Sequence, residues 1–224
     1  MKTFMNMTHV EPPVLPSKFT EDGRMDFGLV EYLIESYSNV GDFVFDPFAG
    51  YGTTLLLAQR LKRIPIGFEK NLDKYSYFID LLKPNSQIIN DDFMNHKSLK
   101  FPQMDLCITS PTYAWENVGC NPFTGNTVNY YDEYLNNIYE YFTHLSQFMK
   151  NNGYIIIEVS NIEWNNQITT MAWDIGKTIS KIKNLKMCKE LVVAWNNQNV
   201  GFGGGNYGFG YDHSYCLIYR KTNY

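Results

Sequence analysis

The chain has 224 residues, enough to bury a sizeable core, and its length favours a single domain. Its formal net charge of -4 argues against a protein that binds nucleic acid mainly through bulk positive charge. The 4 cysteines form no CxxC pair and no metal-ligand spacing with the 4 histidines, so we expect neither a metal site nor a disulfide framework. No apolar run approaches the roughly 18 residues that span a bilayer, and the N-terminus lacks a signal-peptide core. We therefore expect a cytoplasmic protein without membrane contact.

Apolar runs rich in β-branched and aromatic residues alternate with helical patterns along the chain, which predicts βα units and a mainly parallel sheet. The expected strands are residues 43–46, 65–69, 87–90, 106–109, 154–159, 191–195 and 215–220. The expected helices are residues 26–38, 53–61, 72–82, 131–149 and 169–182. The last two strands leave no room for a helix between them, so we expect an antiparallel pair at the edge. The predicted class is α/β, a seven-stranded sheet with helices on both faces.

Two polar, aromatic and glycine-rich segments, 114–130 and 196–212, are too long for ordinary connectors. We interpret them as substrate loops, and the alternative is that they are loops without a role. The sequence shows no internal repeat and no linker. We therefore predict that residues 1–224 form one domain without a separate recognition domain of ordinary size.

The stretch FVFDPFAGYGTTLLLAQRL predicts a strand, a glycine turn and a helix in succession. The strand ends at Asp46, and Gly50 and Gly52 lie in the turn. Glycines at this place let the backbone turn sharply and approach a ligand, while the first helical turn offers unpaired N–H groups. The third glycine of a GxGxxG motif is absent, which argues against a dinucleotide. The pattern indicates a different ligand at the carboxyl edge of the sheet.

Acidic residues at the ends of the next two strands extend this candidate site. Glu69 ends the second strand, seventeen residues after Gly52, where a carboxylate can accept both hydroxyls of an adenosine ribose. After the third strand, Asp91 or Asp92 is placed to meet an adenine amino group, and Phe93 to cover the ring. Glu69 alone could be a surface carboxylate, but its combination with the glycine turn favours a ligand site.

DPFAGYGTT followed by GFE resembles the S-adenosylmethionine-binding motif of the DNA amino-methyltransferases, whose usual form is DPFxGxGTT. The stretch LPSKFT, residues 15–20, is similar to the N-terminal motif that packs against the methionine end of the cofactor in this family. The resemblance implies a Rossmann-like class I methyltransferase fold, with Asp46 or its neighbours near the methionine amino group. The implied cofactor-binding residues are Ser17, Phe19, Asp46, Pro47, Phe48, Gly50, Gly52, Thr53, Thr54, Glu69, Asp91, Asp92 and Phe93.

Ser110-Pro111-Thr112-Tyr113 follows the strand DLCITS and resembles the (S/D/N)PP(Y/F/W) catalytic signature of the same family. An exocyclic amino group is a poor nucleophile because its lone pair is delocalised into the base. A serine hydroxyl and a backbone carbonyl that accept its N–H bonds would aim the lone pair at the methyl group. Tyr113 would stack on a base that has left the duplex. Thr112 replaces the second proline of the signature, which leaves a looser backbone. Without the preceding motif, SPTY would be read as a simple turn.

The resemblance covers nearly the whole chain, because YIIIEVSN and HSYCLIYRK are also typical of these enzymes. It implies direct methyl transfer to the amino group of a flipped cytosine or adenine in DNA, as in restriction-modification. Trp115, Phe202 and Tyr207 in the two loops are expected to stack on the substrate. His213 is expected to form a strand-end hydrogen bond rather than to act in catalysis.

Two alternatives stay open at this point. One is an RNA amino-methyltransferase, which the small size and the weak charge favour. The other is a non-catalytic or partner-dependent protein that binds the cofactor, which Thr112 and the missing recognition domain favour. The sequence also leaves open a homodimer or a separate specificity partner.

Overall fold

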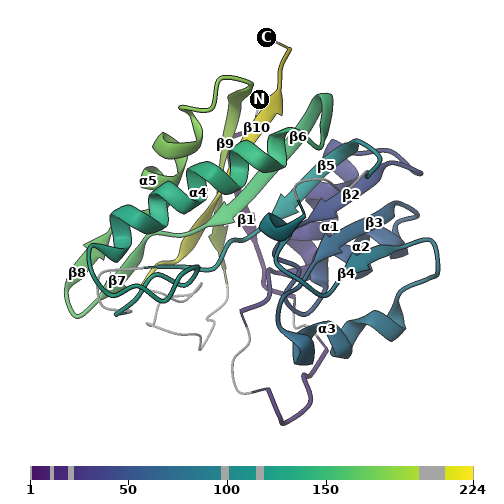
Figure 1. Cartoon of the computed structure of the whole chain (residues 1–224), viewed down its shortest axis with the longest axis horizontal. Coiled ribbons are helices and arrows are strands. Elements are labelled where there is room, and N and C mark those ends of the chain that lie inside the picture. Colours follow the sequence, from purple (N-terminus) through teal and green to yellow (C-terminus); the bar gives the residue numbers. More distant parts are fainter. Residues whose placement is uncertain are drawn as a thin grey trace. The chain divides into compact units, whose positions relative to one another are not determined.

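The computed structural model describes residues 2–10, 13–19, 23–96, 101–114, 119–196 and 210–223. The chain forms two compact units (Figure 1). We call His9–Thr109 the N-terminal unit, and Met1–Thr8 together with Ser110–Tyr224 the C-terminal unit. Among the described residues, no helix has the length and apolar character needed to cross a membrane.

The N-terminal unit contains a parallel sheet in the order β5-β2-β3-β4. Its strands are β2 (Phe43–Asp46), β3 (Ile64–Phe68), β4 (Gln87–Ile89) and β5 (Met104–Thr109). Its helices are α1 (Phe27–Tyr37), α2 (Thr53–Arg60) and α3 (Leu72–Phe78), with the 3-10 turns η1 (Ile79–Leu81) and η2 (Phe93–Asn95). Because the strands are parallel, their carboxyl ends meet at one edge of this sheet, where α/β folds bind ligands.

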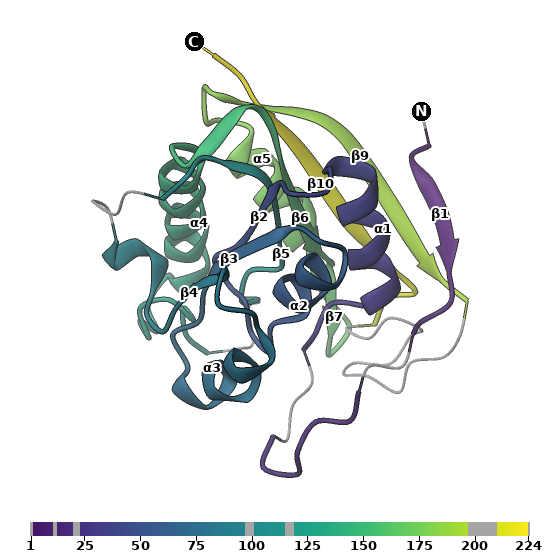
Figure 2. The ribbon, with the colours of Figure 1, turned by 90° about the vertical axis from the view of Figure 1, so that its right-hand side faces the viewer.

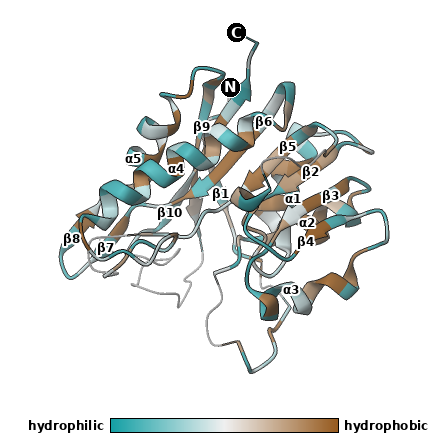
Figure 3. Cartoon of the chain, in the orientation of Figure 1, coloured by the Kyte–Doolittle hydropathy of each residue, from teal (hydrophilic) through white to brown (hydrophobic). Residues whose placement is uncertain are grey.

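The helices of this unit follow from apolar patterning and capping. Asp26 caps α1, since its side chain accepts the N–H of Leu29 (2.9 Å). The helix buries Leu29, Val30, Leu33 and Ile34, which recur with helical spacing on one face. α1 contacts α2, and Figure 2 shows the two helices side by side. Figure 3 shows hydrophobic residues concentrated on β2, β3 and β5, as expected for strands buried between helices.

The C-terminal unit contains strands in the order β1-β9-β10-β6. Its strands are β1 (Phe4–Met7), β6 (Met149–Val159), β9 (Leu185–Trp195) and β10 (His213–Lys221), and its helices are α4 (Tyr130–Ser146) and α5 (Met171–Ile179). β10 runs antiparallel to both β6 and β9, whereas β1 pairs with β9 in parallel. A separate hairpin follows β6, made of β7 (Ile162–Trp164) and β8 (Gln167–Thr169).

The predicted α/β class is confirmed, and each of the seven predicted strands and five predicted helices overlaps an element of the same type, although β6 and β9 begin well before their expected ranges, at Met149 and Leu185. The last two predicted strands do form an antiparallel pair. The prediction that this pair is the edge of the sheet is wrong, because β1 covers the outer side of β9. The prediction that the whole chain is one domain stays a prediction.

Candidate functional site

The turn between β2 and α2 has two residues in the left-handed region of the backbone. Gly50 has φ 56° and Gly52 has φ 81°, values that residues with side chains rarely adopt. A Cβ at Gly52 would lie 2.6 Å from the ring of Phe78. The Gly52 N–H closes the turn by donating to the carbonyl of Ala49 (2.8 Å). The close approach of Phe78 therefore requires glycine at position 52, whereas Gly50 is favoured by its backbone angle alone.

Glu69 lies at the end of β3 and connects the glycine turn to the start of α3. Its Oε2 accepts the N–H of Gly50 (2.7 Å), and its Oε1 accepts the N–H of Asn71 (2.7 Å). The residue is only 9% exposed. Each carboxylate oxygen has a second lone pair, so the group can still accept hydroxyl hydrogens from a ligand. The acidic residue predicted at this strand end thus lies beside the turn.

Asp46 ends β2 and is buried. Its Oδ1 accepts hydrogen bonds from the hydroxyl of Thr109 (2.7 Å) and the N–H of Phe48 (3.0 Å). Burial raises the pKa of Asp46 to about 7, although both hydrogen bonds favour the charged form. Thr109 is the last residue of β5 and directly precedes Ser110. Asp46 therefore joins the strand before the glycine turn to the residue before the catalytic signature.

Sequence reasoning missed Thr109. Its only signal in the sequence is a hydroxyl at the end of an otherwise apolar strand, and such a residue is also common where it has no special role. The partner of that hydroxyl, Asp46, lies on a strand far away in the sequence, so the contact appears only in the structure.

Thr53, the first residue of α2, has an unsatisfied hydroxyl. Among the described residues its Oγ1 has no hydrogen-bond partner, although the side chain is buried. An unpaired buried hydroxyl costs about 1–3 kcal/mol, so a polar ligand group at this place would be favourable. The neighbouring Thr54 is fully buried, and its hydroxyl lies 3.5 Å from the carbonyl of Ile108. In the turn before α2, Pro47 is buried and Phe48 is half-buried.

The donor and acceptor set of this unit fits S-adenosylmethionine. Glu69 suits a ribose diol, Asp46 suits an ammonium group, and the open hydroxyl of Thr53 suits a carboxylate. The first N–H groups of α2 add favourable partners for a negative charge.

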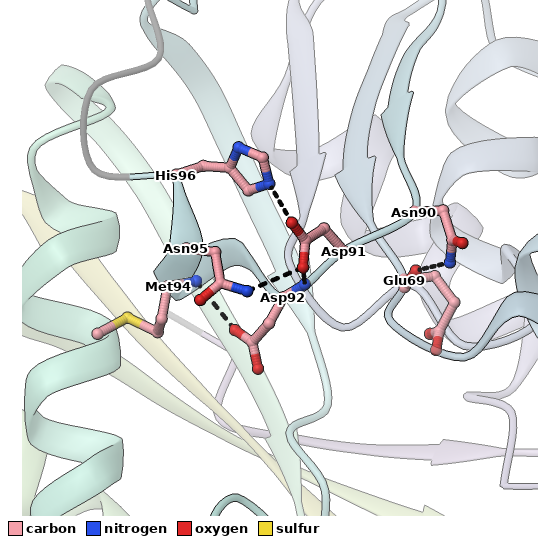
Figure 4. A network of polar contacts seen from close by, with 7 residues as sticks. All are labelled: Glu69, Asn90, Asp91, Asp92, Met94, Asn95 and His96. Carbon is pink, nitrogen blue, oxygen red and sulfur yellow. Dashed lines mark hydrogen bonds and ion pairs between the residues drawn. The ribbon is translucent and has the colours of Figure 1, made fainter.

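A network of polar contacts holds the turn after β4 (Figure 4). Asp91 Oδ1 accepts from the side chain of Asn95 (2.9 Å) and from the N–H of Asp92 (2.7 Å). Asp91 Oδ2 lies 2.9 Å from Nε2 of His96. These contacts, with the Asn95 hydrogen bond first, lower the pKa of Asp91. Both oxygens of Asp91 are thus used to fix the turn.

Asp92 and Phe93 lie at the start of η2. Asp92 Oδ1 accepts the N–H of Met94 (2.9 Å), which caps this short helix. Phe93 is fully buried, and its ring contacts those of Phe45 (5.3 Å between centroids) and Phe68 (5.2 Å). The position of Phe93 therefore favours a packing role over the predicted contact with a ligand ring.

The N-terminal motif lies on the glycine turn. The ring of Phe19 meets that of Tyr51 at 5.0 Å and that of Tyr77 at 5.7 Å, both edge to face. Lys18 adds an exposed ion pair with Asp73 (3.4 Å). Ser17 is exposed. Phe19 thus places the motif beside the glycine turn, and its predicted contact with the methionine end of the cofactor stays a prediction.

The catalytic signature begins the second stretch of the C-terminal unit. Ser110 is half-buried, Pro111 is buried and Thr112 is exposed. The hydroxyl of Tyr113 accepts the N–H of Ser160 (3.1 Å), the residue that follows β6. Tyr113 is therefore anchored by its hydroxyl at the end of that strand.

The two predicted substrate loops are only partly described. Trp115, Phe202 and Tyr207 lie outside the described residues. Residues 119–129 fold back on α4, because the buried Asn121 donates to the side chain of Asn137 (2.8 Å). The ring of Phe123 stacks on that of Tyr134 (5.6 Å). At the start of β10, after the second loop, Nε2 of His213 lies 3.0 Å from the hydroxyl of Tyr215, the strand-end hydrogen bond expected for His213.

Residues 22–80 match the family model described as DNA methylase, the N6_N4_Mtase family. The Type II methyltransferase M.HindIII of Haemophilus influenzae is 44% identical over 54 residues, 24% of this chain and 18% of that protein. The orphan methyltransferase M.BamHII of Bacillus amyloliquefaciens is 36% identical over 93 residues, 42% of this chain and 31% of that protein. The chain thus spans less than a third of the length of these two curated relatives.

The likeness in fold covers far more of the chain. A TehB-like SAM-dependent methyltransferase from Corynebacterium glutamicum gives a TM-score of 0.53 at 11% identity, over 86% of this chain and 87% of that one. At this identity the likeness concerns the fold alone. Residues 22–80 therefore resemble the N6/N4 DNA methylase family, and the chain has the fold of S-adenosylmethionine-dependent methyltransferases.

Proposed function

We propose that the chain is an S-adenosylmethionine-dependent DNA methyltransferase that modifies the exocyclic amino group of cytosine or adenine. The hydrogen bond between Asp46 and Thr109 carries this proposal, because it joins the strand before the glycine turn to the residue before Ser110. β2 and β5 pair in parallel, so both motifs leave the same edge of the sheet. The family of residues 22–80 supports DNA as the polymer.

The cofactor, when bound, supplies an electrophilic methyl group. Glu69 would hold the ribose hydroxyls, and Asp46 and Thr53 the methionine end. Asp91 or Asp92 would accept the adenine amino group, since a carboxylate oxygen that already accepts one hydrogen bond keeps a second lone pair. Phe19 would close the site from the N-terminal motif.

The catalytic signature would orient the amino group. The hydroxyl of Ser110 and a backbone carbonyl of the signature accept its two N–H bonds, which directs the nitrogen lone pair at the methyl carbon. Methyl transfer from the sulfonium sulfur to this nitrogen would leave a neutral thioether, and the proton that the amino group releases would pass to solvent. Tyr113 stacks on a base that has left the duplex. The reaction requires no covalent bond to the protein.

The test is transfer of labelled methyl groups from S-adenosylmethionine to duplex DNA, single-stranded DNA and RNA, offered separately to the purified chain. We expect label in DNA, and mass spectrometry of the digested product then names the base. Label only in RNA would replace the proposed polymer. Cofactor binding without label in any polymer would contradict the proposed activity.

The raised pKa of Asp46 predicts a dependence of stability on pH. The folded chain keeps a proton that the unfolded chain loses above the ordinary pKa of 3.8. The contribution of Asp46 to the free energy of unfolding is therefore expected to fall by several kcal/mol as the pH rises from about 4 to about 7, and to be constant above that. Urea unfolding across this range, compared with Asp46→Asn, measures it. A wild-type curve that parallels the Asp46→Asn curve would contradict the assignment.

Thr112→Pro tests whether the departure from the family signature matters. Thr112 is exposed and Ser110 is unchanged, so we expect the transfer rate to shift by less than about tenfold, or about 1.4 kcal/mol. Rates of methyl transfer at saturating cofactor measure the effect, with Thr112→Ala as the control for loss of the threonine side chain. Activity that arises only in the proline variant would instead indicate a degenerate active site.

A further inference from the structure

We infer that the β7–β8 hairpin reads the edges of bases in duplex DNA beside the nucleotide that is methylated. The inference rests on the proposed function and adds to it an element that recognises the DNA sequence. It concerns residues 162–169, all of which are described and lie within the C-terminal unit.

The tip of the hairpin presents carboxamide groups to solvent. Asn165 and Asn166 form a two-residue turn with φ 50° and φ 60°, and Gln167 follows as the first residue of β8. All three residues are exposed. The turn geometry explains asparagine at the first two positions, because asparagine tolerates positive φ. It does not require a third carboxamide at Gln167.

The stem of the hairpin is fixed to the catalytic signature. Ser160, two residues before β7, donates its N–H to the hydroxyl of Tyr113 (3.1 Å). The side chain of Asn161 accepts the N–H of Ala172 in α5 (3.0 Å). On the other side, Gly210 approaches so closely that a Cβ there would lie 2.6 Å from Cβ of Glu163. The hairpin therefore projects from a stem whose position is coupled to the tyrosine expected to stack on the flipped base.

The chemistry of the tip suits base edges better than phosphates. A carboxamide both donates and accepts hydrogen bonds, and Asn and Gln side chains use both to bind adenine in the major groove. The major groove is wide enough to admit a two-stranded β-ribbon. Ile168 is 62% exposed on the opposite face, where an apolar group can contact a thymine methyl. The only charged residue of the hairpin is Glu163, so the element offers no cation to the phosphate backbone.

The decisive variant is Asn165→Gly/Asn166→Gly. Glycine adopts positive φ freely, so the turn is kept while both carboxamides are removed. The matched control is Asn151→Gly/Asn152→Gly, an exposed asparagine pair near the opposite end of β6 in which Asn152 also has positive φ (67°). Both variants are compared with wild type for the sequences they select from a random pool of duplex DNA and for the bases that flank each methylated site.

We expect the hairpin variant to bind its preferred duplex about ten- to a hundredfold more weakly and to lose preference at flanking bases. Its affinity for S-adenosylmethionine and its melting temperature should equal those of the control. Hydrogen exchange of residues 162–169 should slow when duplex DNA is added to the wild-type chain. The inference is overturned if the hairpin variant selects the same sequences as wild type, if the control loses selection equally, or if only RNA slows exchange.

Hydrogen exchange separates this inference from the proposed function. If duplex DNA slows exchange in a chain that transfers no methyl group, the hairpin binds DNA and the proposed methyltransferase activity is rejected. Methyl transfer to DNA without any change in the exchange of residues 162–169 would retain the activity and reject the hairpin.

Discussion

Gly52→Ala is expected to abolish binding of S-adenosylmethionine and to lower the free energy of unfolding by about 2–5 kcal/mol. Two effects add. The backbone at Gly52 has φ 81°, which is strained for alanine, and the new Cβ would lie within 3 Å of three carbon atoms of Phe78. Relief of that overlap must move either the aromatic ring or the turn. Movement of the turn would displace the Gly50 N–H from Glu69 and disturb the ligand site.

Gly41→Ala is the matched control for backbone strain. Gly41 has φ 88°, and a Cβ there would have no neighbour within 4 Å. We expect a loss of about 1–2 kcal/mol from the backbone alone, with cofactor affinity unchanged. Denaturant unfolding and titration calorimetry with S-adenosylmethionine measure both variants. Equal losses at the two positions would mean that Phe78 moves aside freely and that the turn is not tightly packed.

Ser110→Ala is expected to slow methyl transfer to DNA by at least about a hundredfold, with little change in the affinity for S-adenosylmethionine. The reason is that the serine hydroxyl acts on the amino group of the base and not on the cofactor. Single-turnover transfer rates, measured beside cofactor binding, separate the two effects. A hundredfold loss of cofactor affinity instead would place Ser110 in the cofactor site.

Variants at Tyr113 separate stacking from anchoring. Tyr113→Phe keeps the ring but loses the hydrogen bond from the Ser160 N–H, whereas Tyr113→Ala loses both. Stacking on a base is worth about 1–3 kcal/mol, so the alanine variant should be slower than the phenylalanine variant by about tenfold or more. Equal rates for the two variants, both below that of the wild type, would show that the hydroxyl, and not the ring, is what the reaction requires.

Local signals predicted the N-terminal unit well. The range 43–46 for β2 and the start of α2 at Thr53 match the structure, because an apolar strand, a glycine turn and a helical pattern follow one another without interruption. The end position of Glu69 was predicted for the same reason. Phe93 shows the limit of this reasoning, since an aromatic residue after a strand has the same pattern whether its ring meets a ligand or the core.

The elements that the sequence did not predict depend on distant partners or very short pairings. β1 consists of Phe4-Met5-Asn6-Met7, which has no β-branched residue, and its pairing partner lies at Val192–Trp195. β7 and β8 have three residues each, too few for a period of two to be recognised. The sequence signal for this hairpin was the pair Asn165-Asn166. Two asparagines indicate a hairpin turn less clearly than Asn-Gly does.

The path of the chain sets an order for its folding during synthesis. The N-terminal unit is one uninterrupted stretch, His9–Thr109, so all of its strands are synthesised before the second stretch of the C-terminal unit. β1 is synthesised before the other described strands, but its Phe4 pairs with Val192 of β9. Closing so long a loop adds little to the equilibrium cost, because that cost grows only with the logarithm of length. The delay is therefore kinetic, and β1 is among the last of the described strands to be paired although it is synthesised before the others.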